Sequence, residues 1–476
     1  MEFPINSLIR KAGLLLILFC LAISPAFAGC HCVTPSGSGS MSGADWNNAY
    51  AGLPTTLVRG DIYYLADGTY APNLTFSEPD SGSLTLEIRK AQPGDHCTNT
   101  GWNTSTMGSA QAVLPRQIML STDYVTINGN GSQATPGCGG APGSLVTSAP
   151  PSPADCGIKL DGSGCSGGAN ACNAVMWATQ AVSYITVEYV ELEGNGDNNS
   201  DQFEYFNPYG GTTYTWTHVY GHNAGCVYLQ DGLDGLNMSY SYFWGTEINM
   251  DGGSCHGQFM FDSGADSNGV MANNVFRDIT GTAIWTFANT STTHNNWLFY
   301  NNAIWDSSPV ASWSPFLSDG VIACINTGTN CTNFVFVQNT IVGMTSNSTS
   351  GINNENTGSY TVENNLWYDI AWSGGVTFNT GTGGTYTQDH NSFLNLVTTC
   401  PTGTSNVCVG SAPNPFVNWT SGNLNLAAEN ADWNNRLALS SPFTTDVNGN
   451  PFTSDRGAYQ VVQAVDPPTN VSAKAY

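Results

Sequence analysis

The feature that most constrains the fold is an asparagine that returns through the second half of the chain, each time with a large apolar residue two positions later. By subtraction, the intervals between successive asparagines are 28, 37, 26 and 26 residues. Solenoid repeats are roughly 20–45 residues long, so each interval fits one coil of three short strands with corner loops of varying length. Asparagines stacked from coil to coil can hydrogen-bond through their side-chain amides. The asparagines concerned are Asn274, Asn302, Asn339, Asn365 and Asn391.

A second column of residues follows glycine-containing turns, where Ile248, Ile284, Ile352 and Val376 each open a short apolar strand. Alternation along a strand points one side chain inward and the next outward. This alternation predicts that Trp285, directly after Ile284, faces out. Together the two columns predict an all-β chain, a single-stranded right-handed parallel β-helix with an N-terminal cap.

Composition supports this fold and narrows the partners. Only 10% of residues are charged, whereas Gly, Asn, Ser and Thr abound, which is typical of a turn-dense β protein and excludes helix-rich folds. The net charge is -24. Nucleic acid and anionic membranes bind Lys and Arg clusters, so neither is an expected partner.

Residues 1–28 predict a signal peptide. A basic pair, Arg10 and Lys11, precedes an apolar run of about ten residues and the ending Ala26-Phe27-Ala28, with cleavage expected before Gly29. The run is too short to span a membrane, which takes about 20 residues. The mature chain is therefore expected to be secreted or at the cell surface.

Cysteine usage is consistent with export. Thirteen cysteines remain after the signal peptide, an odd number that predicts several disulfides and one leftover. One interpretation makes Cys30 a lipid anchor, because small residues precede it. Close pairs that could form disulfides are Cys165/Cys172, Cys324/Cys331 and Cys400/Cys408.

The two ends of the chain differ from its middle. Residues 43–70, with Trp46-Asn47-Asn48-Ala49-Tyr50, predict a helical cap that enters the first coil, and Asp455-Arg456-Gly457-Ala458-Tyr459 closes the array. These ends and Ile88-Arg89-Lys90-Ala91 resemble those of secreted bacterial β-helix proteins of the pectin-lyase-like superfamily. The resemblance covers roughly residues 31–462 and implies one domain, 29–462. Residues 463–476 resemble the first strand of a fibronectin type III module.

That resemblance implies a protein acting on polysaccharide in a groove along one outer sheet. A lyase needs a basic residue as proton acceptor. Nine Lys and Arg follow the signal peptide, and of these only Arg277 lies in the middle coils, where Asp278 is its expected partner. A polysaccharide lyase is therefore the less favoured alternative.

A hydrolase needs two carboxyl groups instead. Asn249-Met250-Asp251 and Cys255-His256-Gly257 are a partial echo of the polygalacturonase motifs, but the family's Asp-Asp and Arg-x-Lys are missing. The candidate catalytic residues are Asp251 and Asp262 as acid and base, with His256 orienting them. The alternative is that all three are solvated turn residues.

Candidate substrate-binding residues are aromatic or basic. Trp244, Trp285, Trp216, Trp297 and Trp313 are expected to be exposed. Period-two spacing places His218, Tyr220 and His222 on one face, and the list of substrate-binding candidates is Trp244, Trp285, His218, His222 and Arg277. An acidic surface with aromatic residues favours neutral or cationic glycans.

Calcium is the one cofactor that the sequence suggests. Asp197, Asn199 and Asp201 alternate as oxygen donors of a calcium loop, although Gln202 and Pro208 stand where an EF-hand requires glycine and an acid. A plain polar loop is the alternative.

The sequence thus predicts an extracellular carbohydrate-active β-helix that binds, and in the stronger form hydrolyses, a polysaccharide. The alternative is a non-catalytic surface or adhesive solenoid.

Overall fold

The computed structural model describes residues 28–461 with several internal gaps. The gaps are 132–136, 139–155, 166–173, 196–202, 225–226, 247–256, 280, 282, 290, 307–319, 345–350, 372–375, 380, 382 and 397–399. Expectations for the signal peptide, the C-terminal tail, Ile248, Asp251, His256, Trp313 and the calcium loop (Asp197, Asn199, Asp201) lie outside the described residues.

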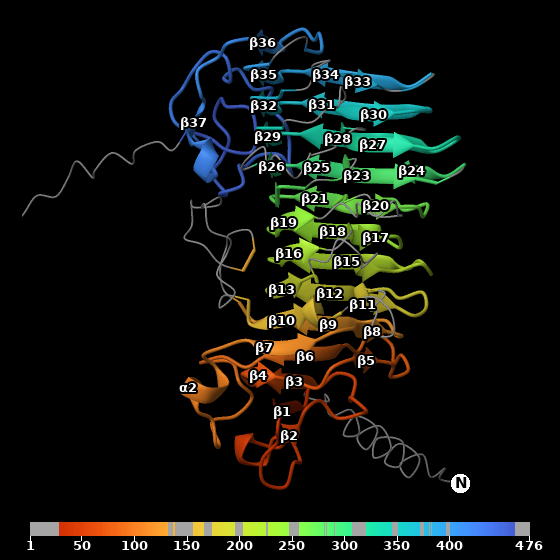
Figure 1. Ribbon diagram of the computed structural model, residues 1–476, viewed down its shortest axis with the longest axis vertical. Coiled ribbons are helices and arrows are strands. Elements are labelled where there is room, and N and C mark those ends of the chain that lie inside the picture. Colours follow the sequence, from red (N-terminus) through yellow and green to blue (C-terminus); the bar gives the residue numbers. More distant parts are fainter. Residues whose placement is uncertain are drawn as a thin grey trace, which may run out of the picture.

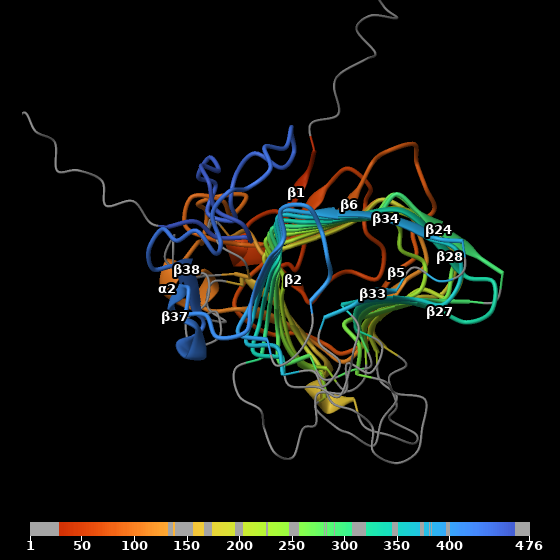
Figure 2. The same cartoon turned by 90° about the horizontal axis from the view of Figure 1, so that it is seen from above.

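The chain winds into a right-handed parallel β-helix, as the sequence predicts. Three long sheets run the length of the molecule, and nearly every strand pairs in parallel with the equivalent strand one coil later (Figure 1). Seen along the axis, the three sheets enclose one continuous core (Figure 2).

We name the sheets A, B and C. Sheet A comprises β2 (Tyr50–Ala51), β1 (Cys30–Thr34), β3 (Ile62–Leu65), β6 (Leu86–Lys90), β9 (Val125–Asn128), β12 (Ile185–Glu188), β15 (Thr212–Thr217), β18 (Asp234–Ser239), β21 (Val270–Ala272), β25 (Leu298–Tyr300), β28 (Asn330–Val337), β31 (Gly358–Glu363) and β34 (Thr385–Asp389), with β24 (Thr293–Asn295) beside β28. Sheet B comprises β4 (Gly68–Thr69), β7 (Ala112–Pro115), β10 (Ile158–Asp161), β13 (Val190–Glu193), β16 (Tyr220–Ala224), β19 (Tyr242–Thr246), β22 (Val275–Arg277), β26 (Ala303–Trp305), β29 (Thr340–Val342), β32 (Leu366–Tyr368), β35 (Ser392–Leu394) and β36 (Val407–Val409). Sheet C comprises β5 (Leu74–Phe76), β8 (Ile118–Leu120), β11 (Ala174–Ala178), β14 (Phe203–Phe206), β17 (Val227–Gln230), β20 (Met260–Asp262), β23 (Ala283–Ala288), β27 (Gly320–Ile325), β30 (Ile352–Asn354) and β33 (Phe378–Asn379). The remaining elements are short: the antiparallel pair β37 (Phe416–Asn418) and β38 (Asn423–Leu426), the helix α2 (Thr104–Met107), and the 3-10 helices η1 (Trp46–Asn48), η3 (Gly162–Gly164) and η5 (Trp419–Ser421).

The predicted asparagine ladder is present at the corner between sheets A and B. Each of the five asparagines is fully buried, and its Nδ2 donates to Oδ1 of the asparagine one coil later. The Nδ2–Oδ1 distances are 3.1 Å for Asn274–Asn302, 3.0 Å for Asn302–Asn339, 3.1 Å for Asn339–Asn365 and 2.9 Å for Asn365–Asn391. Asn406 extends the ladder by one rung, accepting from Asn391 at 3.3 Å. Each buried asparagine amide is thus hydrogen-bonded to another asparagine amide, which explains why asparagine recurs once in each coil.

The residue just before each of the five predicted asparagines has a left-handed backbone. In the earlier coils this corner position holds Tyr189, His218 and Tyr240, whose φ angles are 54°, 53° and 49°. The His218 ring stacks between the other two, with centroid distances of 4.5 Å and 5.4 Å. His218 therefore lies at a corner, not on the strand with Tyr220 and His222, and the period-two prediction is wrong for it.

The prediction that Trp285 faces out is also wrong. Trp285 pairs in register with Met260 and Ile322 and is fully buried in the core. Its neighbour Ile284 is buried too, so β23 shows no outward alternation at this point. Trp216 and Trp297, which the sequence analysis took as exposed, are likewise core residues.

The ends of the solenoid differ from expectation in one respect. Within residues 43–70, all of which the structure describes, the three-residue η1 is the one helical element and most of the remaining regular structure is strand, so the prediction that this cap is helical is wrong. At the other end, residues 412–461 fold back over the outer face of sheet B; we call them the C-terminal segment (Figure 1).

Disulfides form where cysteines meet at corners and ends. The pairs are Cys30–Cys97, Cys138–Cys156, Cys324–Cys331 and Cys400–Cys408, and Cys32 is a buried free thiol among the described cysteines. Two predicted pairs are confirmed; Cys172 lies outside the described residues. Because the sulfur of Cys30 is bonded to Cys97, it has no free thiol for a lipid anchor. None of the described helices is long and apolar enough to cross a membrane.

Candidate functional site

The outer face of sheet B carries a row of polar and aromatic side chains over five successive coils. Leu192, Phe243 and Phe276 alternate into the core, so their neighbours point outward. The strands pair Lys159 with Glu191, Glu193 with His222, His222 with Trp244, and Trp244 with Arg277. We call these six residues (Lys159, Glu191, Glu193, His222, Trp244 and Arg277) the sheet B strip.

The N-terminal half of the strip is a network around the buried carboxylate of Glu191. This carboxylate accepts hydrogen bonds from Nε2 of His222 at 2.9 Å and from Nε2 of Gln111 at 2.7 Å. Burial alone would raise the pKa of Glu191, but the hydrogen bonds from His222 and Gln111 and the charge of Lys159 outweigh it and lower that pKa. Glu191 is therefore ionised at neutral pH.

Lys159 supplies one positive charge to this group of two carboxylates. Its Nζ forms an ion pair with Glu193 and lies 3.7 Å from Oε1 of Glu191. Burial would lower the pKa of Lys159, but the nearby carboxylates outweigh it and raise that pKa. The ring of His222 stacks on Tyr220 with centroids 4.8 Å apart, so those two residues do share a face, as predicted.

The C-terminal half of the strip is an arginine held between two indole rings. The guanidinium carbon of Arg277 lies 4.9 Å from the ring centroid of Trp244 and 4.7 Å from that of Trp305, within cation–π range. Oδ2 of Asp278 accepts from Nε of Arg277 at 3.1 Å and from Nε1 of Trp244 at 3.0 Å. The predicted Arg277–Asp278 pair is confirmed, and Arg277 is only 8% exposed.

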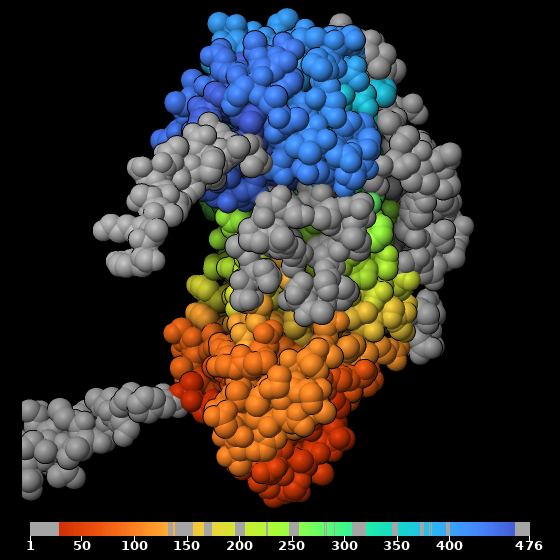
Figure 3. All heavy atoms as spheres, turned by 90° about the vertical axis from the view of Figure 1, so that its left-hand side faces the viewer, coloured from red at the N-terminus to blue at the C-terminus, as the bar shows by residue number. Residues whose placement is uncertain are grey.

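The strip lies between two raised parts of the molecule. On one side are the loops that carry α2 and Gln111; on the other the C-terminal segment packs against Trp305 and the later strands of sheet B. In Figure 3, which faces this side, the orange N-terminal loops lie at one end and the blue C-terminal segment at the other, with yellow and green residues in view between them. The disulfide Cys138–Cys156 packs against Tyr220 and Tyr242 of the same face. Glu193, His222 and Trp244 are partly exposed, whereas Glu191 and Arg277 are buried.

Glu191, Glu193 and His222 also offer the geometry of a metal site. One ligand atom from each lies within 4.8 Å of the other two. Calcium takes six to eight oxygen ligands, whereas this group supplies two carboxylates and one imidazole. The ammonium of Lys159 already pairs with these carboxylates, so a metal ion would have to displace it. The residues fit a lysine better than a calcium ion.

Asp262 does not lie on an outer face of the solenoid, where its predicted role as catalytic acid or base requires it. It is fully buried in the interior, where its carboxyl shares a hydrogen bond with that of Asp266. Burial raises the pKa of Asp262 to about 7 and that of Asp266 to about 8, while burial lowers the pKa of the nearby His294 to about 4. Nδ1 of this uncharged imidazole lies 3.2 Å from Oδ2 of Asp262. The side chains of Asp262 and His294 have no surface exposed to solvent, so neither lies on an outer face of the solenoid.

Of the predicted substrate-binding residues, the structure brings three together: His222, Trp244 and Arg277. It places His218 at a corner, where burial lowers its pKa to about 4, and Trp285 in the core. Sequence reasoning missed Lys159, Glu191 and Glu193. The signal was present as Val190-Glu191-Leu192-Glu193, a strand whose outward positions are both acidic.

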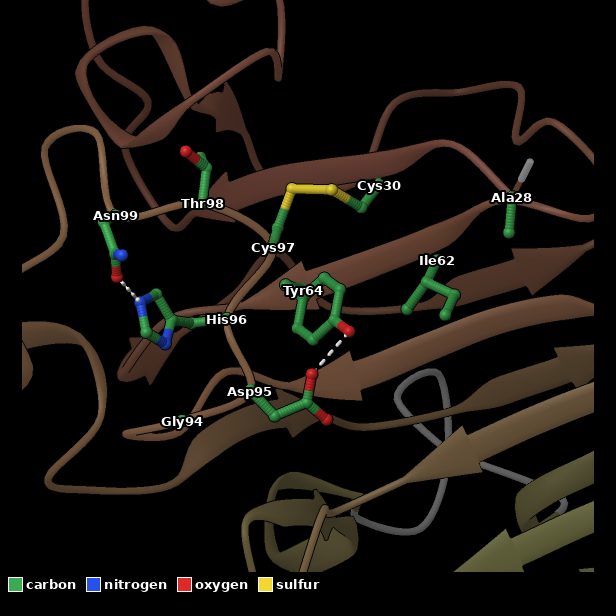
Figure 4. A pocket seen from close by; sticks show the side chains of 10 residues that line it. All are labelled: Ala28, Cys30, Ile62, Tyr64, Gly94, Asp95, His96, Cys97, Thr98 and Asn99. Atoms are coloured by element: carbon green, nitrogen blue, oxygen red, sulfur yellow. Dashed lines mark hydrogen bonds between the residues drawn. A yellow bond between two sulfur atoms is a disulfide. The ribbon is translucent and has the colours of Figure 1, made fainter.

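A separate pocket lies at the N-terminal end, beside the Cys30–Cys97 disulfide (Figure 4). Its floor holds Tyr64, whose hydroxyl donates to Asp95 at 2.6 Å, and Asp95 also pairs with Arg89. His96 faces Asn99 across 2.8 Å at the rim. The side chains of Tyr64, Asp95 and His96 thus already have hydrogen-bonding partners in or beside the pocket.

Comparisons with known proteins give architecture only. No protein-family model and no curated protein matches the sequence. Among solved structures, the pectate lyase Pel9A is similar with 12% identity and a TM-score of 0.48, covering 92% of this chain and 97% of its own. The PL6-family alginate lyase AlyGC is similar with 14% identity and a TM-score of 0.41, covering 71% of this chain and 38% of its own. A GH136 lacto-N-biosidase from Eubacterium ramulus is similar with 10% identity and a TM-score of 0.35, covering 76% of this chain and 67% of its own. At these scores the likenesses carry no argument about chemistry, which has to come from the residues.

Proposed function

We propose that this chain is an extracellular carbohydrate-active solenoid that binds a polysaccharide along the sheet B strip. The observation that carries the proposal is the strip itself, a row of hydrogen-bonding and aromatic side chains repeated from coil to coil, of which Glu193, His222 and Trp244 are partly exposed. Successive strands are about 4.8 Å apart, close to the length of one sugar ring, so a linear glycan can present one ring to each coil. The disulfides fit an oxidising compartment, which supports the extracellular location.

The charges of the strip favour a neutral glycan. Lys159 is paired with Glu193, and Arg277 with Asp278, so neither cation is free to receive a sugar carboxylate. The guanidinium also contacts two indole rings, those of Trp244 and Trp305. Polyuronates would also meet a chain of net charge -24.

Binding is better supported than hydrolysis. A general acid needs a carboxyl group that keeps its proton at working pH. The lowered pKa of Glu191 is the opposite condition, and the predicted catalytic residue Asp262 lies in the core, although its pKa is raised. We therefore propose binding as the function and treat cleavage as an outcome to be measured.

A glycan screen with matched variants tests the proposal. The exported protein is screened against neutral, cationic and acidic polysaccharides by affinity electrophoresis, with and without a chelator, and released reducing ends are measured in parallel. Trp244→Ala and Glu193→Gln should each weaken binding of a neutral glycan about tenfold, since each removes one major contact. Trp102→Ala is the control, because Trp102 is a half-buried tryptophan outside the strip, stacked on His96.

The outcomes separate the alternatives. Binding that is unchanged in both strip variants would remove the site from the proposal, and no binding to any glycan would favour the structural solenoid. Loss of binding with the chelator would show that a metal takes part after all. Release of reducing ends would establish hydrolysis or lysis.

A further inference from the structure

The first described residues make an unusual contact with one carboxylate. The backbone N–H of Gly29 donates to Oδ1 of Asp61 at 2.7 Å, and Nε2 of His31 lies 2.9 Å from Oδ2 of the same residue. The carbonyl of Gly29 accepts from the N–H of Ile62 at 2.8 Å. Gly29 is thus held at both of its backbone groups, just before β1, whereas the preceding Ala28 is exposed.

Only glycine fits at position 29 without a close contact to Asp61. A Cβ on residue 29 would lie 2.7 Å from Oδ1 of Asp61 and 2.8 Å from its Cγ and Oδ2. Any side chain would therefore push the carboxylate away from the chain. An exposed chain end normally tolerates any residue, so this restriction points to a function of the Gly29–Asp61 contact.

The sequence independently predicts that the chain is cut at the same place. Ala26-Phe27-Ala28 is the ending of a signal peptide, with cleavage before Gly29. In that reaction a leader peptidase adds water across the Ala28–Gly29 peptide bond; Ala28 leaves with the new carboxylate and Gly29 keeps the new amino group. The α-amino group has an ordinary pKa of about 7.7–8.0, so it is mostly protonated at neutral pH.

We propose that Asp61 is the binding site for the α-ammonium group that cleavage before Gly29 creates. An amide N–H that donates one hydrogen bond becomes a cation with three donors, at the same position and facing a carboxylate. Charge-assisted hydrogen bonds of this kind are roughly twice as strong as neutral ones. Processing thereby fastens the first strand of the solenoid, and the glycine is required because the ammonium must approach the carboxylate directly.

The neighbouring contacts keep the site in place after the cut. The Cys30–Cys97 disulfide fixes the next residue, and β1 pairs with β3 from Cys30 onward. The ring of His31 stacks on Tyr63 at 4.6 Å, which holds Nε2 on the far oxygen of Asp61. The proposal rests on these contacts and not on the proposed glycan binding.

The test uses the full chain, expressed with its leader and exported. Intact mass and amino-terminal sequencing should show a chain that begins at Gly29 with Cys30 in a disulfide. The purified protein is then exposed to an aminopeptidase, and loss of Gly29 is followed by mass. Asp61→Asn keeps a hydrogen-bond acceptor but removes the charge, and it should speed the loss of Gly29 by roughly three- to fivefold.

Matched variants keep the result decisive. Asp45→Asn removes another acidic residue of the same end and should behave like the unaltered chain. Gly29→Ala keeps Asp61 but forces it away, so it should also speed trimming; it replaces Asp61→Asn if that variant does not fold. Equal trimming in all forms, cleavage at another bond, or a lipid-modified chain that begins at Cys30 would overturn the proposal.

Discussion

Replacing Asn339 by alanine would interrupt the asparagine ladder at its middle rung. In the folded chain the Asn339 amide donates to the carbonyl of Phe299 at 2.9 Å, to that of Val337 at 3.1 Å and to Asn365 at 3.1 Å. Its Oδ1 accepts from both the backbone N–H and the side-chain amide of Asn302 at 3.0 Å. Alanine would remove five hydrogen bonds and leave a buried backbone N–H without a partner.

The size of the effect follows from these contacts. A hydrogen bond contributes about 0.5–1.5 kcal/mol net, and a buried donor left without a partner costs about 1–3 kcal/mol. Since neighbouring amides can re-pair in part, we expect Asn339→Ala to lower the free energy of unfolding by about 3–5 kcal/mol. Denaturation in guanidinium chloride, followed by far-UV circular dichroism, would measure it.

A matched asparagine provides the control. Asn353 on sheet C makes a side-chain bond to Asn379 at the surface, and Asn353→Ala should cost less than about 1 kcal/mol. If Asn339→Ala cost no more than Asn353→Ala, the ladder would contribute nothing beyond an ordinary surface amide and the reasoning would be refuted.

Three further predictions concern buried charges. Burial raises the pKa of Asp262 to about 7, so the contribution of its protonated form to the free energy of unfolding is fully present below the ordinary carboxyl pKa near 4 and is lost as pH rises through about 7. Asp262→Asn should therefore reduce the loss of stability between pH 5 and pH 9 by roughly 2–4 kcal/mol. Parallel stability–pH curves for the two proteins would contradict this. Arg277→Lys keeps the charge but loses the planar group between two indoles, so it should lower stability by about 1–2 kcal/mol in a denaturant titration, and no change would mean that the sandwich is incidental. Arg456→Met removes a buried guanidinium bonded to the carbonyls of Asn391, Ser405 and Asn435; it should lower stability by about 3–5 kcal/mol and make the C-terminal segment sensitive to limited proteolysis, whereas resistance equal to the unaltered chain would refute the role.

The fold was predictable because its repeat lies in the residues themselves. An inward asparagine can be satisfied only by other buried polar groups, so its return at coil-length intervals fixes both the architecture and the register of that corner. Trp285 was misplaced for a different reason: the prediction assumed that one side of its strand meets solvent, whereas all six residues of β23 are buried. The sequence does not show that both sides of this strand are covered.

The candidate site was less predictable because it depends on neighbours from other coils. Glu193 and His222 lie 29 positions apart, and only the pairing of β13 with β16 makes them adjacent. Likewise, Trp305 is fully buried because the C-terminal segment, more than a hundred residues away in the chain, covers it. His218 was misplaced because a left-handed corner residue interrupts the alternation that its flanking strand residues obey.

The C-terminal segment changes how the solenoid should respond to a pulling force. In a simple solenoid each coil touches only its neighbours, so coils can detach one at a time from a free end. Here the segment bonds to four successive coils, through Asn301 to Thr445, Thr340 to Ala458, Asn364 to Gly457 and Asn391 to Arg456. These last coils should therefore come apart together, as one mechanical unit, and the array should begin to unravel from this end only after residues 445–458 have been pulled away.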